Sequence, residues 1–434
     1  MAEHRRGANL PSIGGFNRTV VLDAVRRSPD GLSRVELAAR TGLSAQTVSN
    51  VTRFLIEAGM IAESGTIVSG RGKPRTILRL EPGSRYAVGV HVDPAVVTYV
   101  LLDLAGTVVA ASTTSTPTAD DPSQVVRTIA SAVDGLVADA GVAVESVLGV
   151  GIASPGPIDV EAGIVVDPPF LPRWRDVPLR DAVAEATGYP VLLEKDVTAA
   201  AVGEMFLAGE SSARNFAFVY FGTGFGVGLV VDHEPVRGVG SNAGDAGHIM
   251  VDQGSLAGTP DGSGTRGEVG AAVAPDRLVR VARSRGLALS GGGAVKEAGA
   301  GADATDATDA TDAADVDAVN AAWDELAAAI ADGDDTAVTL AADAGTVMGN
   351  AVVLIVNLLD IDRVVFGGPF WSRIASAALP AARTAIVGSP LLVPKHAVQV
   401  VESDRGADVA AVGAACLVLD AALSPRASTL LIRR

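Results

Sequence analysis

Hydrophobic and polar residues follow one pattern before residue 80 and another after it. In the first part, apolar side chains recur at helical spacing, as in the stretch from Asn17 to Arg27. From Tyr86 onward, strand-like runs alternate with Ala-rich stretches of helical composition such as 124–139. The strand-like runs are YAVGVHV, VTYVLLDL, VLGVGIA, FAFVYFG and VGLVVD. This alternation predicts an α/β domain preceded by a smaller, mainly helical unit.

These two patterns suggest where the domains begin and end. Within the second, three consecutive Asp-Ala-Thr units form a low-complexity acidic run, which predicts a disordered surface insertion at 301–315. Helical periodicity returns after it and is followed by one more strand and an Ala-rich terminal helix. The expected segments are a flexible arm at 1–15, a compact unit at 16–80, a linker at 81–85, the α/β domain at 86–434, helical residues at 316–359, a strand at 362–366 and a helix at 407–423.

The compact unit contains the start and stop signals of two short helices. Ser33 followed by Glu36 forms a capping box, the first helix stops at Gly42, and Ser44 caps the second. Apolar side chains of the second helix lie at helical spacing, namely Val48, Val51, Leu55 and Ile56. A short helix, a glycine turn and a capped second helix predict a helix-turn-helix.

The outward face of the second helix carries polar side chains and no acidic residue until Glu57. Gln and Asn amides can pair with adenine, whereas Arg53 is suited to the phosphate backbone. A helix pair used only for dimerisation is the alternative, and the lack of acidic residues argues against it. The DNA-contacting residues expected from the two helices are Arg34, Ser44, Gln46, Thr47, Ser49, Asn50 and Arg53.

The segment MIAESGTIVSGRGKPRTILRL predicts two short strands joined by a wing around Gly65 to Gly70. Within it, GRGKPR places Arg71, Lys73 and Arg75 on a stretch constrained by glycine and proline. Such a stretch can lie along a narrow minor groove, where the negative potential attracts arginine. A basic linker without this role is the alternative.

Charge is divided unevenly between the two parts of the chain. Residues 1–80 hold 12 Lys and Arg against 6 Asp and Glu, a net charge of +6. Since the whole chain has a net charge of −16, the remaining residues have a net charge of −22. A basic module on an acidic body suits a protein that offers only one end to DNA, although chance clustering would give the same count.

Other features of the composition narrow the protein class. Cys416 is the only cysteine, so a single chain can form neither a disulfide nor a cysteine-based zinc site. The N-terminus lacks the apolar stretch of a signal peptide. The longest uncharged stretches, near 216–231 and 344–359, fall short of the roughly 20 residues of a membrane span. We therefore expect a soluble cytoplasmic protein with no membrane partner.

Four short motifs occur in order within the second domain: GVGIASPGPID at 149–159, LEKDVTAAAVGE at 193–204, FGTGFGVGLV at 221–230 and NAGDAGHI at 242–249. A single Gly-rich loop would be weak evidence, but the order and spacing of the four are specific. With them the chain resembles the ROK family (repressor, open reading frame, kinase), in its xylose-repressor-like branch with an N-terminal winged helix-turn-helix. The resemblance covers nearly the whole chain and extends to FLPRWRDVPL at 170–179, VVFGG at 364–368 and GAACLVL at 413–419.

The resemblance implies a two-lobed, actin-like sugar-kinase fold of the ribonuclease H-like class, with the ligand in the cleft and a dimer or tetramer as the assembly. In family kinases an acidic residue is the general base for the sugar hydroxyl, and the matching position is Asp196. The neighbouring asparagine, which binds sugar hydroxyls, is Lys195 here. Since an ammonium group only donates hydrogen bonds, recognition must differ from the family or favour an anionic ligand.

The Gly-Glu-x-Gly-His motif of the family, which contacts sugar, corresponds to Asp245 and His248. The zinc loop that follows it in the family has three cysteines, whose positions hold Asp261, Ser263 and Glu268 in this chain. The glutamate after the last cysteine, another sugar contact in the family, is replaced by Gly270. The expected effector-binding residues are Lys195, Asp196, Asp245 and His248, and we expect no structural zinc and no cofactor.

The phosphate-binding side also departs from the family. Family kinases begin this domain with an Asp, two Gly and a Thr around the ATP phosphates, whereas here Pro94 and Ala95 fill the turn. A β-carbon and a proline ring obstruct close approach of the backbone to a phosphate. The second turn keeps its glycines at Gly222, Gly224 and Gly226, a feature that shapes the backbone with or without ATP.

The sequence therefore predicts a transcription regulator, by default a repressor of carbohydrate-utilisation genes, without kinase activity. Its expected partners are a double-stranded DNA operator, a sugar or sugar-phosphate effector in the cleft, and further copies of the chain. Two alternatives remain open: an active ROK-type sugar kinase with an appended DNA module, which Asp196 favours, and a body whose effector site is vestigial and which only dimerises.

Overall fold

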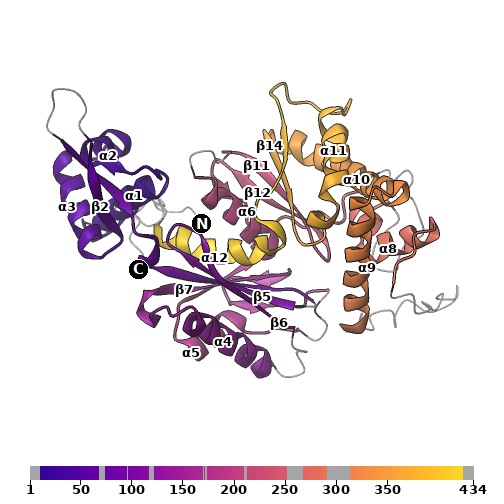
Figure 1. Cartoon of the computed structure of the whole chain (residues 1–434), viewed down its shortest axis with the longest axis horizontal. Helices are drawn as coiled ribbons and strands as arrows, with labels where there is room; N and C mark the ends of the chain where they lie inside the picture. Colours follow the sequence, from indigo (N-terminus) through magenta and orange to yellow (C-terminus); the bar gives the residue numbers. More distant parts are fainter. Residues whose placement is uncertain are drawn as a thin grey trace.

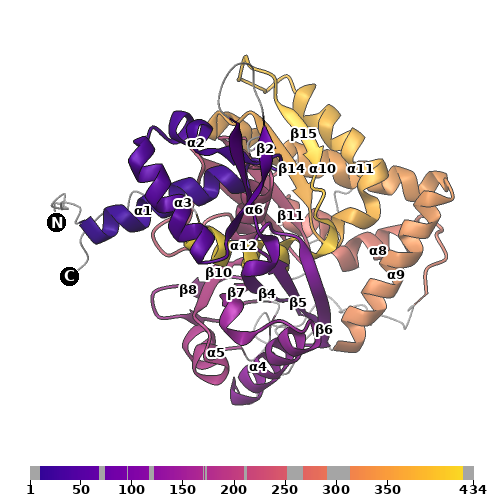
Figure 2. The same cartoon turned by 60° about the vertical axis from the view of Figure 1, so that its left-hand side comes forward.

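The computed structural model describes residues 10–67, 74–94, 96–116, 122–169, 171, 174–209, 213–251, 267–290 and 313–423. A small module lies at one end of the molecule, and a larger body with two β-sheets makes up the rest (Figure 1). The two sheets lie one above the other with the yellow helix near the C-terminus between them (Figures 1 and 2). The α/β fold class expected from the alternating pattern is confirmed.

The small module is a winged helix. It contains α1 (Leu10–Arg26), α2 (Arg34–Thr41) and α3 (Ala45–Glu57), with a three-stranded sheet in the order β1 (Leu32–Ser33), β3 (Arg75–Leu80), β2 (Ile61–Ile67). Gly42 ends α2 in the left-handed region at φ 71°, which glycine adopts without strain. The apolar positions expected inside, among them Val48, Val51 and Leu55, are buried. The helix-turn-helix expected from the capping signals is therefore present.

Two boundaries of the module differ from the expectation. Helix α1 begins at Leu10, so residues 10–15 are helical rather than part of a flexible arm, and the helix ends at Arg26. The expected linker 81–85 contains a short 3₁₀ helix, η1 (Pro82–Ser84). Its first residues are bonded to both sides, because the Glu81 amide donates to the Met60 carbonyl at 2.9 Å and the Leu104 amide donates to the Pro82 carbonyl at 3.0 Å. Backbone hydrogen bonds thus tie the connection to the module and to the body.

The first lobe of the body has a five-stranded sheet in the order β10-β7-β4-β5-β6. Its strands are β4 (Tyr86–Val92), β5 (Val96–Asp103), β6 (Val108–Ser115), β7 (Val147–Ser154) and β10 (Val191–Lys195). The strands β4, β5 and β6 form an antiparallel meander, while β7 and β10 join in parallel. Helices α4 (Pro122–Asp139) and α5 (Leu179–Thr187) pack on the outer face through a shared apolar core. Minor elements are η2 (Val144–Ser146), β8 (Ile158–Asp159) and β9 (Ile164–Val165).

The second lobe has a five-stranded sheet in the order β13-β12-β11-β14-β15. Its strands are β11 (Phe216–Phe221), β12 (Phe225–Val231), β13 (Glu234–Pro235), β14 (Arg363–Gly367) and β15 (Gln399–Glu402). The helices that share its outer apolar core are α7 (Val269–Val273), α8 (Pro275–Ser284), α9 (Ala313–Ala331), α10 (Asp335–Leu359) and α11 (Trp371–Val387). Because α9 begins at Ala313, the last three residues of the expected 301–315 insertion are helical, and residues 301–312 lie outside the described residues.

Two helices lie between the sheets: α6 (Asp196–Leu207) and α12 (Val409–Leu423), the latter preceded by η5 (Gly406–Asp408). They approach their neighbours closely, since a β-carbon on Gly151 would lie 1.8 Å from the Ala414 carbonyl oxygen. By length and composition α10 and Gly406–Leu423 could each cross a membrane, but 56% and 72% of their apolar windows is buried inside the fold. They are core helices of the body.

The module and the body share one hydrophobic core. It joins Val21 and Val25 of α1 with Phe206 of α6 and Ala415 of α12. The full set of buried members from the module is Val21, Leu22, Val25, Leu37, Val48, Val51, Leu55, Ile61 and Leu78, and from the body Ala87, Val100, Leu102, Leu104, Phe206, Ala411, Val412, Ala415, Cys416, Val418, Leu419 and Leu423. The winged helix is therefore packed on the body and not merely tethered to it.

Candidate DNA interface and ligand cleft

The capping box at the start of α2 forms as expected from the sequence. The Ser33 amide and hydroxyl both donate to Glu36 Oε2, at 2.8 and 2.6 Å, and the Glu36 amide donates back to Ser33 Oγ at 3.4 Å. These hydrogen bonds from the Ser33 side chain and backbone lower the pKa of the Glu36 carboxyl. The box fixes the entry of the first helix of the helix-turn-helix.

Helix α3 presents a polar face to solvent. Its first turn is capped by Ser44, whose Oγ accepts from the Thr47 amide at 3.2 Å and lies 2.9 Å from Thr47 Oγ1. Gln46 and Asn50 are exposed one turn apart, and Gln46 Nε2 donates to Asn50 Oδ1 at 3.1 Å. The hydrogen bond holds the two amides side by side in the absence of DNA. Arg53 continues this exposed row, while Thr47 and Ser49 are half-buried.

Arg34 differs from the other residues expected to contact DNA. Its Nε donates to Thr52 Oγ1 at 3.1 Å, and its Nη2 pairs with Glu63 Oε1 on β2 at 3.0 Å. The guanidinium group thus ties α2 to α3 and to the wing strand. The structure gives Arg34 a role inside the module, and contact with DNA would require it to exchange these partners.

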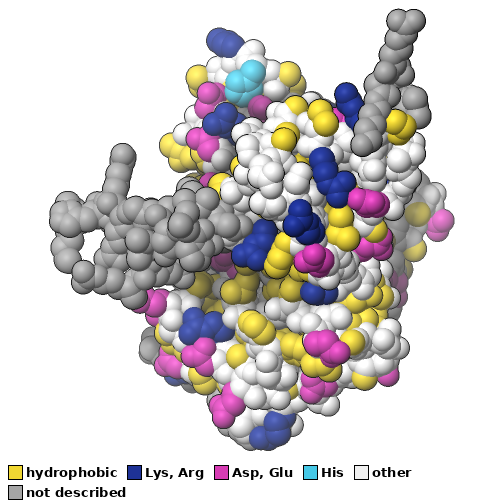
Figure 3. Space-filling view, turned by 90° about the vertical axis from the view of Figure 1, so that its left-hand side faces the viewer, with side chains coloured by type: hydrophobic (Ala, Val, Ile, Leu, Met, Phe, Trp, Pro, Cys, Tyr) yellow, Lys and Arg dark blue, Asp and Glu magenta, His cyan; other side chains and the backbone are white. Residues whose placement is uncertain are grey.

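The wing is described only in part. Arg75 is exposed at the first position of β3, next to the tip of the wing. Arg71 and Lys73 lie outside the described residues, so their proposed minor-groove contact stays a prediction. On the end of the molecule that carries the module, Lys and Arg side chains form a diagonal row across the middle of the face (Figure 3).

Asp196 is the first residue of α6, between the two lobes, and its side chain is half-buried. Burial raises the pKa of its carboxyl, against the opposing effects of His91, the Val197 amide and Lys195. The Val197 amide donates to Asp196 Oδ1 at 2.7 Å. A carboxylate held at a helix N-terminus is suited to accepting hydroxyl hydrogen bonds from a bound ligand.

Two further groups near Asp196 were not expected from the sequence. His91 on β4 is buried, and its ring lies edge-on to that of Tyr220 on β11, with the ring centres 6.2 Å apart. Burial raises the pKa of Tyr220 well above its ordinary value, and the carboxylates of Asp196 and Asp93 raise it further. The Tyr220 hydroxyl is buried and has no hydrogen-bond partner among the residues that the structure describes. A histidine within the apolar run YAVGVHV was the available sequence signal.

Lys195 is buried beside Asp196 and points toward the loop that carries the last motif. Only 7% of its surface is exposed, and its Nζ donates to the Asn242 carbonyl oxygen at 3.2 Å. The Asn242 side chain in turn accepts from the Ile158 amide at 2.8 Å and donates to the Ile158 carbonyl at 2.7 Å. The preceding residue, Glu194, is buried and forms an ion pair with Arg237 at 2.6 Å. Asn242 and Arg237 are parts of this network that the sequence analysis missed.

Asp245 and His248 lie on the same loop, and both are exposed. His248 Nδ1 lies 3.1 Å from Oε2 of the buried Glu268, so these two residues are joined directly. The loop approaches the first turn of α6, because the Gly244 carbonyl accepts from the Val227 amide at 2.9 Å, and a β-carbon on Gly244 would lie 3.2 Å from Val197 Cγ2. The structure therefore brings the loop of Asp245 and His248 against the helix turn that begins at Asp196.

No cluster of three metal-binding side chains occurs in the part of the chain that the structure describes. Asp261 and Ser263, at two of the positions of the family's zinc-loop cysteines, lie outside that part. Glu268, at the third, is hydrogen-bonded to His248. The expectation that the chain holds no structural zinc stays a prediction.

The turn after β4 is linked to the opposite lobe. Thr223 Oγ1 in the β11–β12 turn donates to Asp93 Oδ2 at 3.3 Å, and the Thr116 hydroxyl donates to the Asp93 carbonyl. Asp93 therefore contacts a side chain of the other lobe, at the turn to which the family resemblance assigns phosphate binding. Pro94 follows directly in the described chain and offers no amide hydrogen.

The fold and the site define a class of protein: a winged-helix module seated on a two-lobed, sugar-kinase-like body, with the half-buried Asp196 and the buried Lys195 between its lobes. Residues 21–62 match the model "Winged helix-turn-helix DNA-binding" and residues 87–421 match that of the ROK family. Since the second match covers more than half of the sequence, the chain belongs to the ROK family. The family resemblance inferred from the four motifs is therefore confirmed.

Curated relatives include named repressors. The chain is 27% identical to the xylose repressor of Bacillus subtilis over 56% of this chain and 63% of that protein. It is 32% identical to an uncharacterized protein of Sinorhizobium fredii over 49% of this chain and 54% of that protein. The matches thus span between half and two thirds of the length of these relatives.

Solved structures show the same fold. A ROK family transcriptional regulator described as a homologue of the Escherichia coli MLC protein aligns with a TM-score of 0.69 at 22% identity, over 95% of this chain and 98% of that one. A ROK family glucokinase from Streptomyces griseus, in complex with glucose and AMPPNP, aligns with a TM-score of 0.60 at 24% identity, over 76% of this chain and 98% of that one. At these identities the likeness concerns the fold alone.

Proposed function

We propose that this protein is a sequence-specific DNA-binding repressor of carbohydrate-utilisation genes, controlled by a sugar or sugar phosphate in the cleft. The observation that carries the proposal is the exposed face of α3, where Gln46 and Asn50 are held side by side and followed by Arg53. Such a face can read adenine edges in the major groove while its arginine contacts phosphate. The named repressors among the relatives support the same reading.

We propose that the effector binds at Lys195, Asp196, Asp245 and His248. The buried ammonium of Lys195 donates to one neutral carbonyl, so a ligand with a carboxylate or phosphate would give it a stronger, charge-assisted partner. Asp196 would accept hydroxyl hydrogen bonds from the same ligand. An anionic sugar derivative therefore fits the pair better than a neutral sugar.

The proposal excludes kinase activity. Asp196 keeps the position of the family's catalytic base, but Asp93 is hydrogen-bonded to Thr223 and followed by Pro94 where a phosphate-binding turn would need free backbone amides. The proposal also includes a cytoplasmic location and a homo-oligomer, dimer or tetramer, because a dimer places two recognition helices on half-sites one DNA turn apart.

The first test is fluorescence anisotropy of labelled duplexes from the region upstream of the gene. The titration is repeated with D-xylose, D-glucose, D-glucuronate and D-glucose 6-phosphate. We expect tight, salt-sensitive binding that one of the anionic compounds releases. No specific binding to any duplex would refute the repressor function, and turnover of ATP with a hexose would favour the kinase alternative.

A matched pair of variants tests the role of Lys195. In Lys195→Asn the preference for anionic over neutral sugars should fall by about tenfold, since a charge-assisted hydrogen bond is lost. The control is Lys395→Asn, which removes one exposed ammonium on the second lobe. An unchanged preference in Lys195→Asn would show that this ammonium does not contact the effector.

A further inference from the structure

Helix α6 runs from the cleft to the DNA module. It begins at Asp196, one of the proposed effector contacts, and ends at Leu207. Twelve residues in α-helical geometry span about 18 Å. Its last turn contributes Phe206 to the apolar core that also contains Val21 and Val25 of α1. One rigid element therefore touches both functional regions of the protein.

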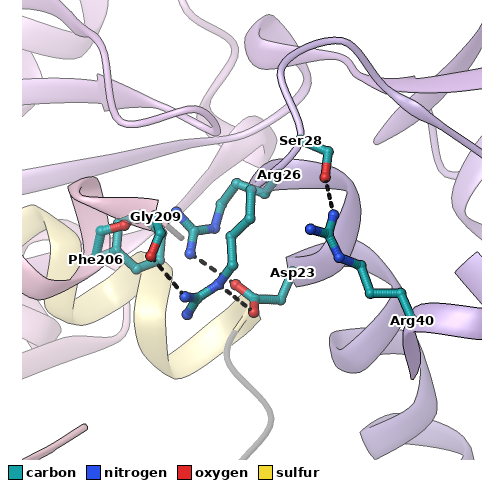
Figure 4. Close-up of polar contacts among 7 residues, drawn as sticks. Asp23, Arg26, Ser28, Arg40, Phe206 and Gly209 are labelled. Carbon is teal, nitrogen blue, oxygen red and sulfur yellow. Dashed lines mark hydrogen bonds and ion pairs between the residues drawn. The ribbon is translucent and has the colours of Figure 1, made fainter. Parts of the chain in front are cut away.

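Arg26, the last residue of α1, and Arg27, which follows it, bind the C-terminal end of α6 and the turn after it. Arg26 Nη1 donates to the Phe206 carbonyl oxygen at 2.9 Å, and Arg27 Nη1 donates to the Gly209 carbonyl oxygen at 3.0 Å. Asp23 holds both guanidinium groups, with Oδ1 2.8 Å from Arg26 Nη2 and Oδ2 2.7 Å from Arg27 Nε. We call Asp23, Arg26 and Arg27 the arginine clamp; Figure 4 shows the Asp23 carboxylate turned toward the guanidinium groups, with Phe206 and Gly209 beyond them.

The chemistry of the clamp suits a helix end. The last carbonyl groups of a helix lack intrahelical partners and carry partial negative charge, so cations stabilise them. The guanidinium carbon of Arg26 also lies 3.8 Å from the centre of the Phe206 ring, a cation–π contact. The Arg26 side chain is only 5% exposed, so the clamp is largely shielded from solvent. Its position follows that of the end of α6.

The opposite end of α6 contacts the two loops of the cleft. A β-carbon on Gly226, in the Gly-rich strand β12, would lie 2.5 Å from Val197 Cγ1, and one on Gly244 would lie 3.2 Å from Val197 Cγ2. Val197 is thus packed between the β11–β12 hairpin and the loop of Asp245 and His248. Any displacement of either loop must move Val197 and the first turn of α6.

Close packing against α12 means that a shift at one end of α6 moves the whole helix. A β-carbon on Gly203 would lie 2.8 Å from Gly413 Cα, and one on Gly413 would lie 2.0 Å from the Ala199 carbonyl oxygen. Backbones in such close approach leave no room for a local bend that would absorb a shift. Packed elements of this kind move by small rigid translations.

We infer that α6 is the element that couples the cleft to the DNA module, and that the arginine clamp positions the module according to the state of the cleft. This inference rests on the proposed function. The clamp residues are positioning residues, since they contact the end of α6 and the turn that follows it. A small rotation of α1 would change the spacing of two recognition helices in a dimer, to which half-site binding is sensitive.

A ligand-free double-mutant cycle tests the inference. Gly226→Ala presses a methyl group against Val197 at the cleft end of α6, and the affinity for the operator duplex is measured by anisotropy in full-length protein. The same change is then made in the double variant Arg26→Gln, Arg27→Gln. The matched control background is Arg214→Gln, which removes an exposed arginine paired with Asp232 on the second lobe.

We expect Gly226→Ala to shift the operator Kd by about fivefold or more in the wild-type and Arg214→Gln backgrounds, and by less than about twofold in the clamp variant. A merely structural clamp would alter melting temperature but not this difference. Equal shifts in all three backgrounds, or no shift in the wild type, would overturn the inference. Absence of specific duplex binding by the wild type would instead refute the proposed function itself, and the inference with it.

A second measurement covers the case in which Gly226→Ala fails to fold. Thermodynamic linkage is reciprocal: if a change in the cleft alters the affinity for DNA, then binding of DNA must alter the cleft end of α6. Adding operator duplex should therefore change amide hydrogen exchange over Asp196–Leu207 in the wild type and leave it unchanged in the clamp variant. The same change in both proteins would overturn the inference.

Discussion

The recognition helix α3 and the cleft differ in how their polar side chains are already engaged when no ligand or DNA is bound. On α3, Ser44, Gln46 and Asn50 form local hydrogen bonds that leave the exposed face ready to meet DNA. In the cleft, Lys195 and Asp93 are engaged with other parts of the body, and Tyr220 is buried with its hydroxyl unpaired in the described structure. The residues of the DNA-reading surface therefore come from one short segment, whereas the cleft is built by contacts between segments that are distant in the sequence.

The largest effect that separates the two regions is expected from Asp196→Ala. The ligand response should be lost, because the carboxylate at the start of α6, proposed to accept hydroxyl hydrogen bonds from the effector, is removed, while operator affinity stays within about twofold. Anisotropy with and without the releasing sugar measures both quantities. A variant that still responds fully would remove Asp196 from the site.

Effector binding in the cleft should depend on pH through Asp196, whereas DNA binding by α3 should not. Because the pKa of Asp196 is raised in the folded protein, the accepting carboxylate is present above that pKa and is lost as the pH falls through it. Effector affinity should therefore decline at a higher pH than an ordinary aspartate would give, while Asp196→Asn shows no such decline. Isothermal titration calorimetry across the acidic range provides the test, and identical pH profiles would contradict it.

A smaller effect is expected on the DNA side from Asn50→Ala. Loss of one base contact costs about 1–3 kcal/mol of discrimination, so binding to the operator should weaken while binding to a scrambled duplex stays the same. The effector response measured as a fold-change should not alter. Equal weakening on both duplexes would show that Asn50 contributes no sequence information.

The capping box should matter for stability and not for recognition. Ser33→Ala removes the hydroxyl that bonds Glu36 and should lower the free energy of unfolding by about 1 kcal/mol. Since the pKa of Glu36 is lowered in the folded state, the contribution of its charge is present above the ordinary glutamate pKa and lost as the pH falls below it. Urea denaturation at neutral and acidic pH checks both points, and a cost that grew on acidification would contradict the second.

The smallest effect is expected from Arg75→Ala beside the wing. Removal of one phosphate contact should reduce the salt slope of operator binding by about one unit. Arg79→Ala, on the same strand but bonded to the Asp30 carbonyl at 3.2 Å, is the matched control and should leave the slope unchanged. The same slope in wild type and Arg75→Ala would place Arg75 away from the DNA backbone.

Structural features that depend on residues close together in the sequence could be predicted from it. The helix-turn-helix rests on Ser33, Gly42 and Ser44, whose signals act within a few residues. The exposed edge strand β6 was missed because Val108 and Val109 face solvent and its remaining side chains are small or polar, so no alternation with a buried face marks it. The start of α1 was placed too late because Gly14 and Gly15 are poor helix formers, yet both lie within the helix.

The cleft could be predicted only in part. Lys195 and Asp196 are found from a local motif, but the Asn242 carbonyl that receives the Lys195 ammonium lies 47 residues away. The pairing of Asp93 with Thr223 spans 130 residues, and that of Arg26 with Phe206 spans 180. Such contacts arise when the two lobes and the winged-helix module pack together, so no spacing in the sequence indicates them.

The apolar core shared by α1 and α12 has a consequence for the order in which the protein matures. Ala411, Ala415 and Leu419, near the end of the chain, complete the surface on which Val21 and Val25 of the first helix rest. During synthesis the DNA-reading segment is made about 360 residues before the helix on which its module rests. A nascent chain can fold the helix-turn-helix early, but it acquires the orientation of that module only when translation is nearly finished.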